Sequence, residues 1–313
     1  MTIVASTTLA DALDAIAAEA PALDADPAFP HGAFARLRRA GALTAPPSRG
    51  EEWALVRAVA KADGSVGRLL EGHLNACERL ELEGIDLAGR LVGVWGAPPG
   101  PGEGEPAYLA GDGTLHGTKV FCSGAGGLDG ALVTASGQLV FVDLAAHVEI
   151  DRDWYRAGGM RASESHRVTF HGAPVLATLR ELTTEPYFSG DAIRTAAAWA
   201  GIADAVADAA LAAIAPDADD LRAHAAGRII TARATIDRWF EHAAVAHDLR
   251  AISVPLRVAV ADAGAAIIGH AARATGSRPF AIGTSLDRAR RDFELFVLQH
   301  RLDPMLARLG RSR

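Results

Sequence analysis

The hydrophobic pattern of this chain changes its period twice. From residue 1 to about 88, apolar residues recur at the spacing of helices, whereas from about 90 to 183 short apolar runs alternate with glycine and proline. From about 189 to 310 the helical spacing returns, now with a high content of alanine. Any fold of this sequence therefore has to place a block of short strands between two helical regions.

We expect an α+β protein with an N-terminal helical domain at residues 1–88, a middle antiparallel β domain at 89–185 and a C-terminal helical bundle at 186–313. Alanine-rich faces let helices approach each other closely, so the bundle should be a tight four-helix bundle. Proline interrupts helical hydrogen bonding, so Pro304 is expected to end or kink the last helix. The four helices are expected at residues 190–215, 219–248, 254–275 and 285–303.

Composition and charge exclude several classes of protein. The chain has 313 residues, of which 50% are hydrophobic, and a formal net charge of −7 without a basic stretch, which argues against nucleic-acid binding. Cys77 and Cys122 are the only cysteines, so neither a disulfide framework nor a thiolate metal site is predicted. Four histidines lack metal-ligand spacing and are expected at the surface: His116, His147, His166 and His171.

The first twenty residues are acidic and amphipathic, with Thr8 and Asp11 spaced as a helix capping box. They lack the basic start and the unbroken apolar core of a signal peptide. The longest apolar runs, such as residues 195–215, are interrupted by Asp204 and Asp208, so no membrane-spanning segment is predicted. We expect a soluble, cytoplasmic protein.

Two segments of the β region carry the most specific signals. The first, GTKVFCSGAGGLD at residues 117–129, contains four glycines and places Cys122 and Ser123 directly after an apolar pair, which suggests a turn or a close approach to the backbone. The second, WYRAGGMRASESHRVTFHGAPV, covers residues 154–175, and a third signal is the Arg-Asp pair in LDRARRDFELFVLQH at 286–300. On these segments the chain resembles the acyl-CoA dehydrogenase superfamily, in a shortened form and over nearly its whole length.

That resemblance implies a flavin held between the β domain and the bundle. In the family, the segment matching FCSG runs along the edge of the flavin ring, where a hydroxyl and backbone amides bind it. Read without the family, the same residues are a glycine-rich strand end. The resemblance implies that the flavin-binding residues are Trp95, Phe121, Cys122, Ser123, Arg161 and Ser163. FAD is the expected cofactor and FMN the alternative, because the family's segments for the ADP half of FAD are not matched.

The family's catalytic glutamate is absent. In most members it lies eight residues after the Asp of the Arg-Asp pair, and counting from Asp292 gives His300. In some relatives it precedes an arginine on the first bundle helix, where this chain has Ile193 before Arg194. His300 and His73 both lie on apolar helix faces and are the candidate catalytic residues; the alternative is that each is a core histidine. Arg161 and Arg194 either serve an anionic ligand or are ion-paired.

These features resemble a branch of the superfamily, the monooxygenases that use reduced flavin. Three functions stay open: oxidation of an acyl-CoA-type substrate, monooxygenation of a small aromatic substrate, and a catalytically degenerate binding subunit. The family also implies a homodimer or homotetramer, formed through the helices at residues 219–275, and a flavin reductase or electron-transfer partner.

Overall fold

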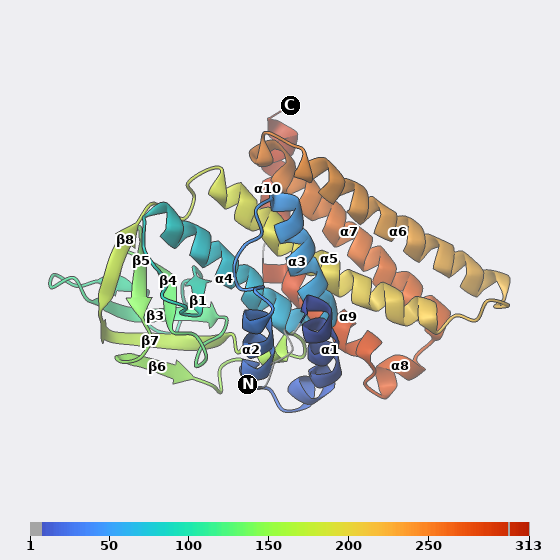
Figure 1. The fold of residues 1–313 in the computed structure, drawn as a ribbon, viewed down its shortest axis with the longest axis horizontal. Helices are drawn as coiled ribbons and strands as arrows, with labels where there is room; N and C mark the ends of the chain where they lie inside the picture. Colours follow the sequence, from blue (N-terminus) through green and yellow to red (C-terminus); the bar gives the residue numbers. More distant parts are fainter. Residues whose placement is uncertain (1–7, 300, 313) are drawn as a thin grey trace, which may run out of the picture.

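The computed structural model describes residues 8–299 and 301–312. A β domain lies on one side of the molecule and the long helices of the C-terminal half lie on the other, with the N-terminal helices between them (Figure 1). The predicted α+β class is therefore confirmed. The domain boundaries expected from the sequence remain predictions.

The described part of the N-terminal region has four helices, and three of them begin with a side-chain cap. Thr8 and Asp11 form the predicted capping box, and the side chain of Asp63 accepts a hydrogen bond from the backbone of Val66. Such caps each stabilise a helix by about 0.5–2 kcal/mol. The helices are α1 (Leu9–Ala25), α2 (His31–Arg39), α3 (Arg49–Ala62) and α4 (Gly64–Leu82).

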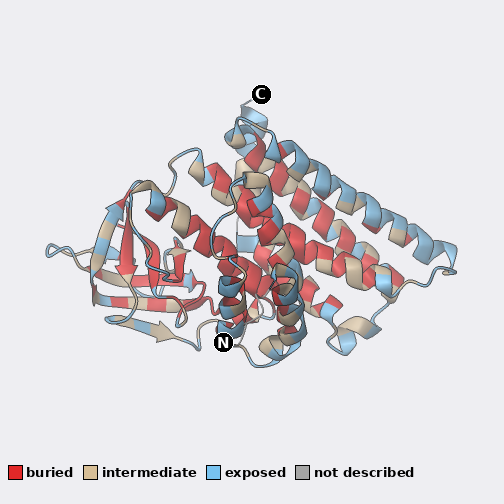
Figure 2. Cartoon of the chain, in the orientation of Figure 1, coloured by how far each residue is buried: buried red, intermediate tan, exposed pale blue. Residues whose placement is uncertain are grey.

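Helix α4 lies at the centre of the molecule, and most of its residues are buried (Figure 2). It packs against strand β1 (Val92–Trp95) on one side and against helix α5 (Tyr187–Ala212) on the other. Small residues allow this density: a Cβ atom on Gly67 would lie 2.3 Å from the Cβ of Ala60 on α3. Because α4 touches both halves, it sets how the β domain meets the bundle.

The β domain contains two four-stranded sheets, with strand orders β1-β4-β5-β8 and β2-β3-β7-β6. Two short turns, AGDG and ASGQ, join β2 to β3 and β4 to β5. One pairing differs from the antiparallel expectation, because β1 pairs with β4 in parallel. After β1, the strands are β2 (Tyr108–Leu109), β3 (Leu115–Cys122), β4 (Gly130–Ala135), β5 (Gln138–Asp143), β6 (Val148–Asp151), β7 (His166–Ala173) and β8 (Val175–Leu179).

The C-terminal region is helical as predicted, but its last helix is shorter than expected. The helical pattern over 285–303 is divided into an α-helix, a 3-10 turn and a further helix. Pro304 lies in the first turn of that further helix, where a missing N–H costs nothing, so it does not end a helix. After α5, the elements are α6 (Asp220–Ala244), α7 (Leu249–Thr275), α8 (Arg278–Ala281), α9 (Ser285–Phe296), η2 (Val297–Gln299) and α10 (Leu302–Arg311).

Helix α7 bears on the expectation that no segment of the chain spans a membrane. Among the described helices, it alone is long and apolar enough, by length and composition, to cross a membrane. In the structure α7 packs along α5 and α6, which accounts for its apolar composition.

Candidate functional site

Three serines meet where β3 ends and β7 begins. The Oγ atom of Ser165 lies 2.9 Å from Oγ of Ser123 and 2.8 Å from Oγ of Ser163, and the Ser163 hydroxyl donates to the carbonyl of Met160 at 2.6 Å. All three serines are buried. We refer to Ser123, Ser163 and Ser165 as the serine cluster. It contains two of the residues expected to bind flavin, and Ser165 was missed.

The backbone around the serine cluster is strained. Phe121, Met160 and Glu164 have φ angles of 53°, 53° and 46°, in the left-handed region that non-glycine residues rarely adopt. Strain of this kind persists only where the surroundings enforce it, and it gathers at functional sites. The two strained segments are joined by a backbone hydrogen bond of 2.7 Å from Gly124 to the carbonyl of Ser163.

The glycines after Ser123 have a structural reason within the chain itself. A Cβ atom on Gly124 would lie 2.8 Å from the side chain of Leu128, and one on Gly127 would lie 2.0 Å from the ring of Phe29. The segment is therefore pressed against the N-terminal helical region. The sequence suggested that something packs closely against the backbone here. At Gly124 and Gly127 that neighbour is another part of the chain, not a ligand.

The residues next to Ser123 form two groups, those buried in the core and one that is exposed to solvent. Trp95 is buried and donates from Nε1 to the carbonyl of Ser123 at 3.0 Å, so it supports the cluster from within the core. Cys122 is fully buried, and burial raises the pKa of its thiol, which makes it an inert core residue. Phe121 points outward with 52% of its surface exposed, and its ring meets Trp154 edge-on at 4.9 Å.

The Arg-Asp pair of α9 holds the loop that leads into the serine cluster. Asp292 accepts a hydrogen bond of 2.5 Å from the backbone of Met160, and burial raises the pKa of this carboxyl to about 8. Arg291 donates to the carbonyl of Gly158. A Cβ atom on Gly159 would lie 2.2 Å from the carbonyl oxygen of Arg291, so only glycine fits there. The bundle thus positions a loop of the β domain.

Tyr155 and His166 lie beside the serine cluster and were not predicted as site residues. The Tyr155 hydroxyl lies 3.3 Å from the carbonyl oxygens of Gly159 and Met160, and burial raises its pKa to about 12, so it is a neutral donor. Its ring meets the His166 imidazole edge-on at 6.2 Å.

His166 is buried, so the expectation that it lies at the surface is wrong. Its Nε2 atom is 3.2 Å from Oε2 of Glu164, but neither ring nitrogen makes a well-formed hydrogen bond to a described residue. Glu164 is paired with Arg152 at 2.7 Å. The alternation of β7 held the signal for burial, because His166 shares a strand face with Val168 and Phe170, both of them buried.

His73 is also buried, on α4, and both of its ring nitrogens are occupied. The backbone N–H of Val92 donates to Nδ1 at 3.2 Å, and Nε2 lies 3.2 Å from the carbonyl oxygen of Leu43. Burial lowers the pKa of His73, which favours the neutral ring. These contacts are those of a structural histidine that joins α4 to β1. The other candidate, His300, lies outside the described residues.

Arg161, in the 3-10 turn η1 (Arg161–Ser163), is partly exposed, and it makes no ion pair with a described residue. It is therefore available to an anionic ligand beside the serine cluster. Arg194 is not available, because its guanidinium is surrounded by carboxylates of the chain. Within residues 8–299 and 301–312, no group of three or more His, Cys, Asp or Glu side chains could hold a metal ion.

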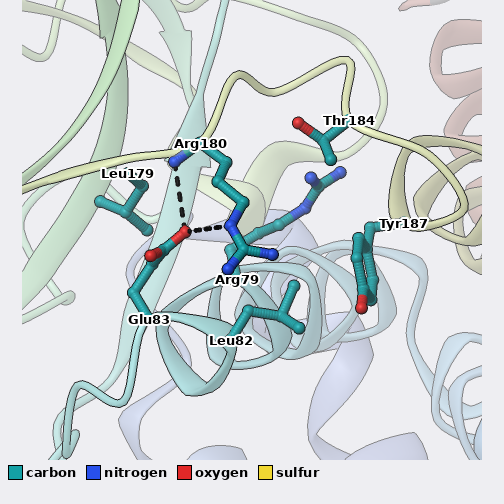
Figure 3. A pocket seen from close by; sticks show the side chains of 7 residues that line it. All are labelled: Arg79, Leu82, Glu83, Leu179, Arg180, Thr184 and Tyr187. Carbon is teal, nitrogen blue, oxygen red and sulfur yellow. Dashed lines mark hydrogen bonds and ion pairs between the residues drawn. The ribbon is translucent and has the colours of Figure 1, made fainter.

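Two hollows adjoin the domains. One lies between the end of α4, β8 and the start of α5, with Arg79, Glu83 and Tyr187 in its wall (Figure 3); at about 10 Å³ it has room for no more than a water molecule. The other is an open groove of about 440 Å³ along β6 and β7, and it includes Arg152, which reaches Glu164. The ion pair of Arg152 with Glu164, which stands between Ser163 and Ser165 in the sequence, links this groove to the serine cluster.

Neither a family model nor a curated protein matches the chain. Solved structures do match. TdsC, the dibenzothiophene monooxygenase of Paenibacillus sp. A11-2, determined with FMN and indole, is similar with a TM-score of 0.78 and 18% identity over 96% of this chain and 94% of TdsC. The methanesulfinate monooxygenase MsuC of Pseudomonas fluorescens gives a TM-score of 0.79 and 18% identity over the same shares, 96% and 94%. A nitrososynthase of Micromonospora carbonacea var. africana gives 0.79 and 20% over 97% of this chain and 94% of its own.

These likenesses show the fold. The chain has the acyl-CoA dehydrogenase-like fold in the form that these monooxygenases share, as the sequence resemblance implied. At identities of 20% or less, residue roles and substrates do not follow from the fold.

Proposed function

We propose that this protein is a flavin-dependent monooxygenase that uses reduced FMN to oxidise a small aromatic substrate. The observation that carries the proposal is the serine cluster with its strained flanks, Phe121, Met160 and Glu164, at the edge where the β domain meets α4 and α9. Buried hydroxyls on enforced backbone are suited to hold the polar edge of a planar ring.

The residues present fit an FMN ring and its phosphate. The hydroxyls of Ser123 and Ser165 bond to each other and can instead turn toward a ligand, since a hydroxyl both donates and accepts. The exposed ring of Phe121, braced by Trp154, offers an apolar surface, and Arg161 offers a cation to the phosphate. FMN is preferred to FAD because several similar structures carry FMN and because the sequence lacks the family's segments for the ADP half.

Reduced FMN supplies the activation of oxygen when it is bound. Around it, Tyr155 is a neutral hydrogen-bond donor, and the imidazole of His166 can take or give a proton if its ring turns toward the ligand. Burial of the cluster excludes water from the reacting atoms. His300, at the family's base position, stays a prediction for the residue that serves the substrate proton.

Acyl-CoA dehydrogenation is the less favoured function. It needs a carboxylate to remove the α-proton, and at the bundle-helix position the chain has Ile193, which is fully buried among apolar residues. The degenerate-subunit alternative is disfavoured by the strain, which a chain without a ligand has no reason to retain.

A separate reductase is expected to supply the reduced flavin. Neither sheet of the described residues is the doubly wound parallel sheet that binds a nicotinamide dinucleotide. We propose that NAD(P)H acts on a partner protein and that reduced FMN passes to this chain, in the cytoplasm.

Ser123→Ala tests the flavin site. Loss of one neutral hydrogen bond should weaken FMN binding by about 0.5–1.5 kcal/mol, or shift its absorption spectrum, and leave the circular dichroism unchanged. FMN titration by fluorescence quenching measures this, with exposed Ser136→Ala as the matched control. An unchanged dissociation constant and spectrum for Ser123→Ala would show that the segment is only a strand end.

We also propose that α6 and α7 pair with a second copy of the chain. α6 is an outer helix with few buried residues (Figure 2), and it exposes Leu221 and Ile230 by 67% and 57%. Apolar patches of this kind are usually covered by symmetric association. Multi-angle light scattering should give twice or four times the 32.6 kDa mass of one chain, and a monomer at micromolar concentration would contradict this.

A further inference from the structure

Arg257 of α7 is turned into the bundle, and only 3% of its surface is exposed. Its guanidinium carbon lies 5.5 Å from the centre of the Trp199 ring on α5, and its Nη1 atom lies 3.5 Å from Sδ of Met305 on α10. Neither neighbour carries a negative charge. Within the part of the chain that the structure describes, Nε and Nη2 have no hydrogen-bond partner, and no carboxylate forms an ion pair with Arg257. A buried cation left in this state is costly.

The two donors without partners form one side of the guanidinium. Nε–H and Nη2–H point the same way in the plane of the group, and this edge binds the two oxygens of a carboxylate in a bidentate pair. Burial lowers the pKa of Arg257 only to about 10, so the group stays charged at neutral pH. The bundle therefore contains a fixed positive charge whose two-donor edge is complementary to a carboxylate.

The walls beside Arg257 are aromatic and lead toward the serine cluster. The ring of Trp199 meets that of Phe296 on α9 edge-on at 6.1 Å, and the Arg68 guanidinium of α4 lies 5.7 Å from the Phe296 ring. α4 in turn packs against η1, which carries Ser163. Arg68 differs from Arg257 because it is paired with Glu71. An aromatic ligand between Arg257 and the serine cluster would thus lie among aromatic side chains.

Helix α10 covers Arg257 and is itself loosely packed. None of its residues is buried, and Leu306 and Leu309 are 37% and 44% exposed. It rests on α7, and Met305 closes over the guanidinium. A helix with so little buried surface has a low cost of local opening, so it can admit a ligand that the closed structure has no room for.

We propose that Arg257 binds the carboxylate of a small aromatic acid that is the substrate of this protein, and that α10 closes over it. That this acid is a substrate rests on the proposed function. That Arg257 binds a carboxylate does not, and it can be tested without flavin.

The test uses benzoate as probe and benzamide, its neutral counterpart of the same shape, with the flavin-free full chain. Binding is measured by calorimetry and by the shift of the melting temperature. Benzoate should bind at least about tenfold more tightly than benzamide, since a bidentate charged pair is lost with the amide. Arg257→Met should weaken benzoate binding by at least about tenfold while its melting temperature stays at or above that of the unchanged protein. Arg273→Met, an exposed arginine on the same helix, should bind as the unchanged protein does.

Several results would overturn the proposal: equal binding of benzoate and benzamide, undiminished benzoate binding by Arg257→Met, or protection by sodium sulfate equal to that by benzoate. Arg257→Lys covers the case in which the methionine variant fails to fold. It keeps the charge but loses the two-donor edge, so undiminished benzoate binding there would also contradict the proposal. FMN titration of the same proteins separates the two claims: benzoate binding without FMN binding sinks the proposed function, and the reverse result sinks the role of Arg257.

Discussion

Arg194 and Arg257 are both buried arginines of the helical bundle, and their surroundings are opposite. Arg194, on α5, is fully buried and lies 2.6 Å from Glu52, 3.0 Å from Asp191 and 3.2 Å from Glu78. Arg257, on α7, has an aromatic ring and a thioether beside it and no described carboxylate. The positive charge of Arg194 is thus compensated by carboxylates, whereas that of Arg257 is not compensated by any described residue.

The difference separates a structural group from a functional one. The carboxylates around Arg194 come from α3, α4 and α5, so its ion pairs join the first helical region to the bundle. Arg257 forms no ion pair with a described residue, and a buried cation in that state costs stability. A protein that keeps such a group has a use for it in binding, which is where stability is commonly given up for function.

The largest expected effect is that of Arg194→Met. Removing this cation leaves carboxylates buried without a partner, which should lower the free energy of unfolding by about 3–5 kcal/mol. Urea denaturation measures the change, with Arg257→Met in the same series. The methionine at 257 should cost nothing or stabilise. Equal losses from the two variants would break the comparison, because they would mean that Arg257 is structural as well.

A smaller effect concerns the pH dependence of the Arg194 cluster. Although Arg79 and Arg194 lie 2.7 and 3.0 Å away, burial outweighs them and raises the pKa of Asp191 from 3.8 to about 6. Between these two values the folded state binds more protons than the unfolded state. The contribution of Asp191 is therefore fully present below about pH 4 and is lost as the pH rises to about 6.

Asp191→Asn should remove this dependence. The difference in unfolding free energy between the unchanged protein and the variant should fall as the pH rises from 4 to 6, by at most about 1.4 kcal/mol per unit. Urea titrations at several pH values measure it. Glu78 is present in both proteins; burial opposes the lowering of its pKa, but Arg49 and Arg194 outweigh burial. A difference that rises with pH would mean that the ion pairs dominate over burial.

The sequence by itself determined the order of the parts and the segment that leads into the site. The changing period of the hydrophobic pattern predicted a helical region, a β region and a second helical region. The resemblance of FCSG and GGMRASES to a known family pointed to Ser123 and Ser163. It could not give Ser165 or Tyr155 as site residues, because their roles depend on two segments meeting in space. The burial of His166 could have been predicted from the sequence, since the alternation of β7 places it on the buried face. Its position beside the Glu164 carboxylate could not.

The meaning of each buried charge was decided only by the tertiary structure. By composition and helical periodicity alone, Arg194 and Arg257 look the same, since each is one arginine in an alanine-rich helix. Helical periodicity shows which face of a helix is apolar, but it does not show which other helices supply that face with neighbours. α5 meets α3 and α4, which bring carboxylates, whereas the neighbours of Arg257 on α5 and α10 bring Trp199 and Met305. Since the energy of a buried charge depends on the groups within a few ångströms of it, only the packed structure could tell a compensated arginine from an uncompensated one.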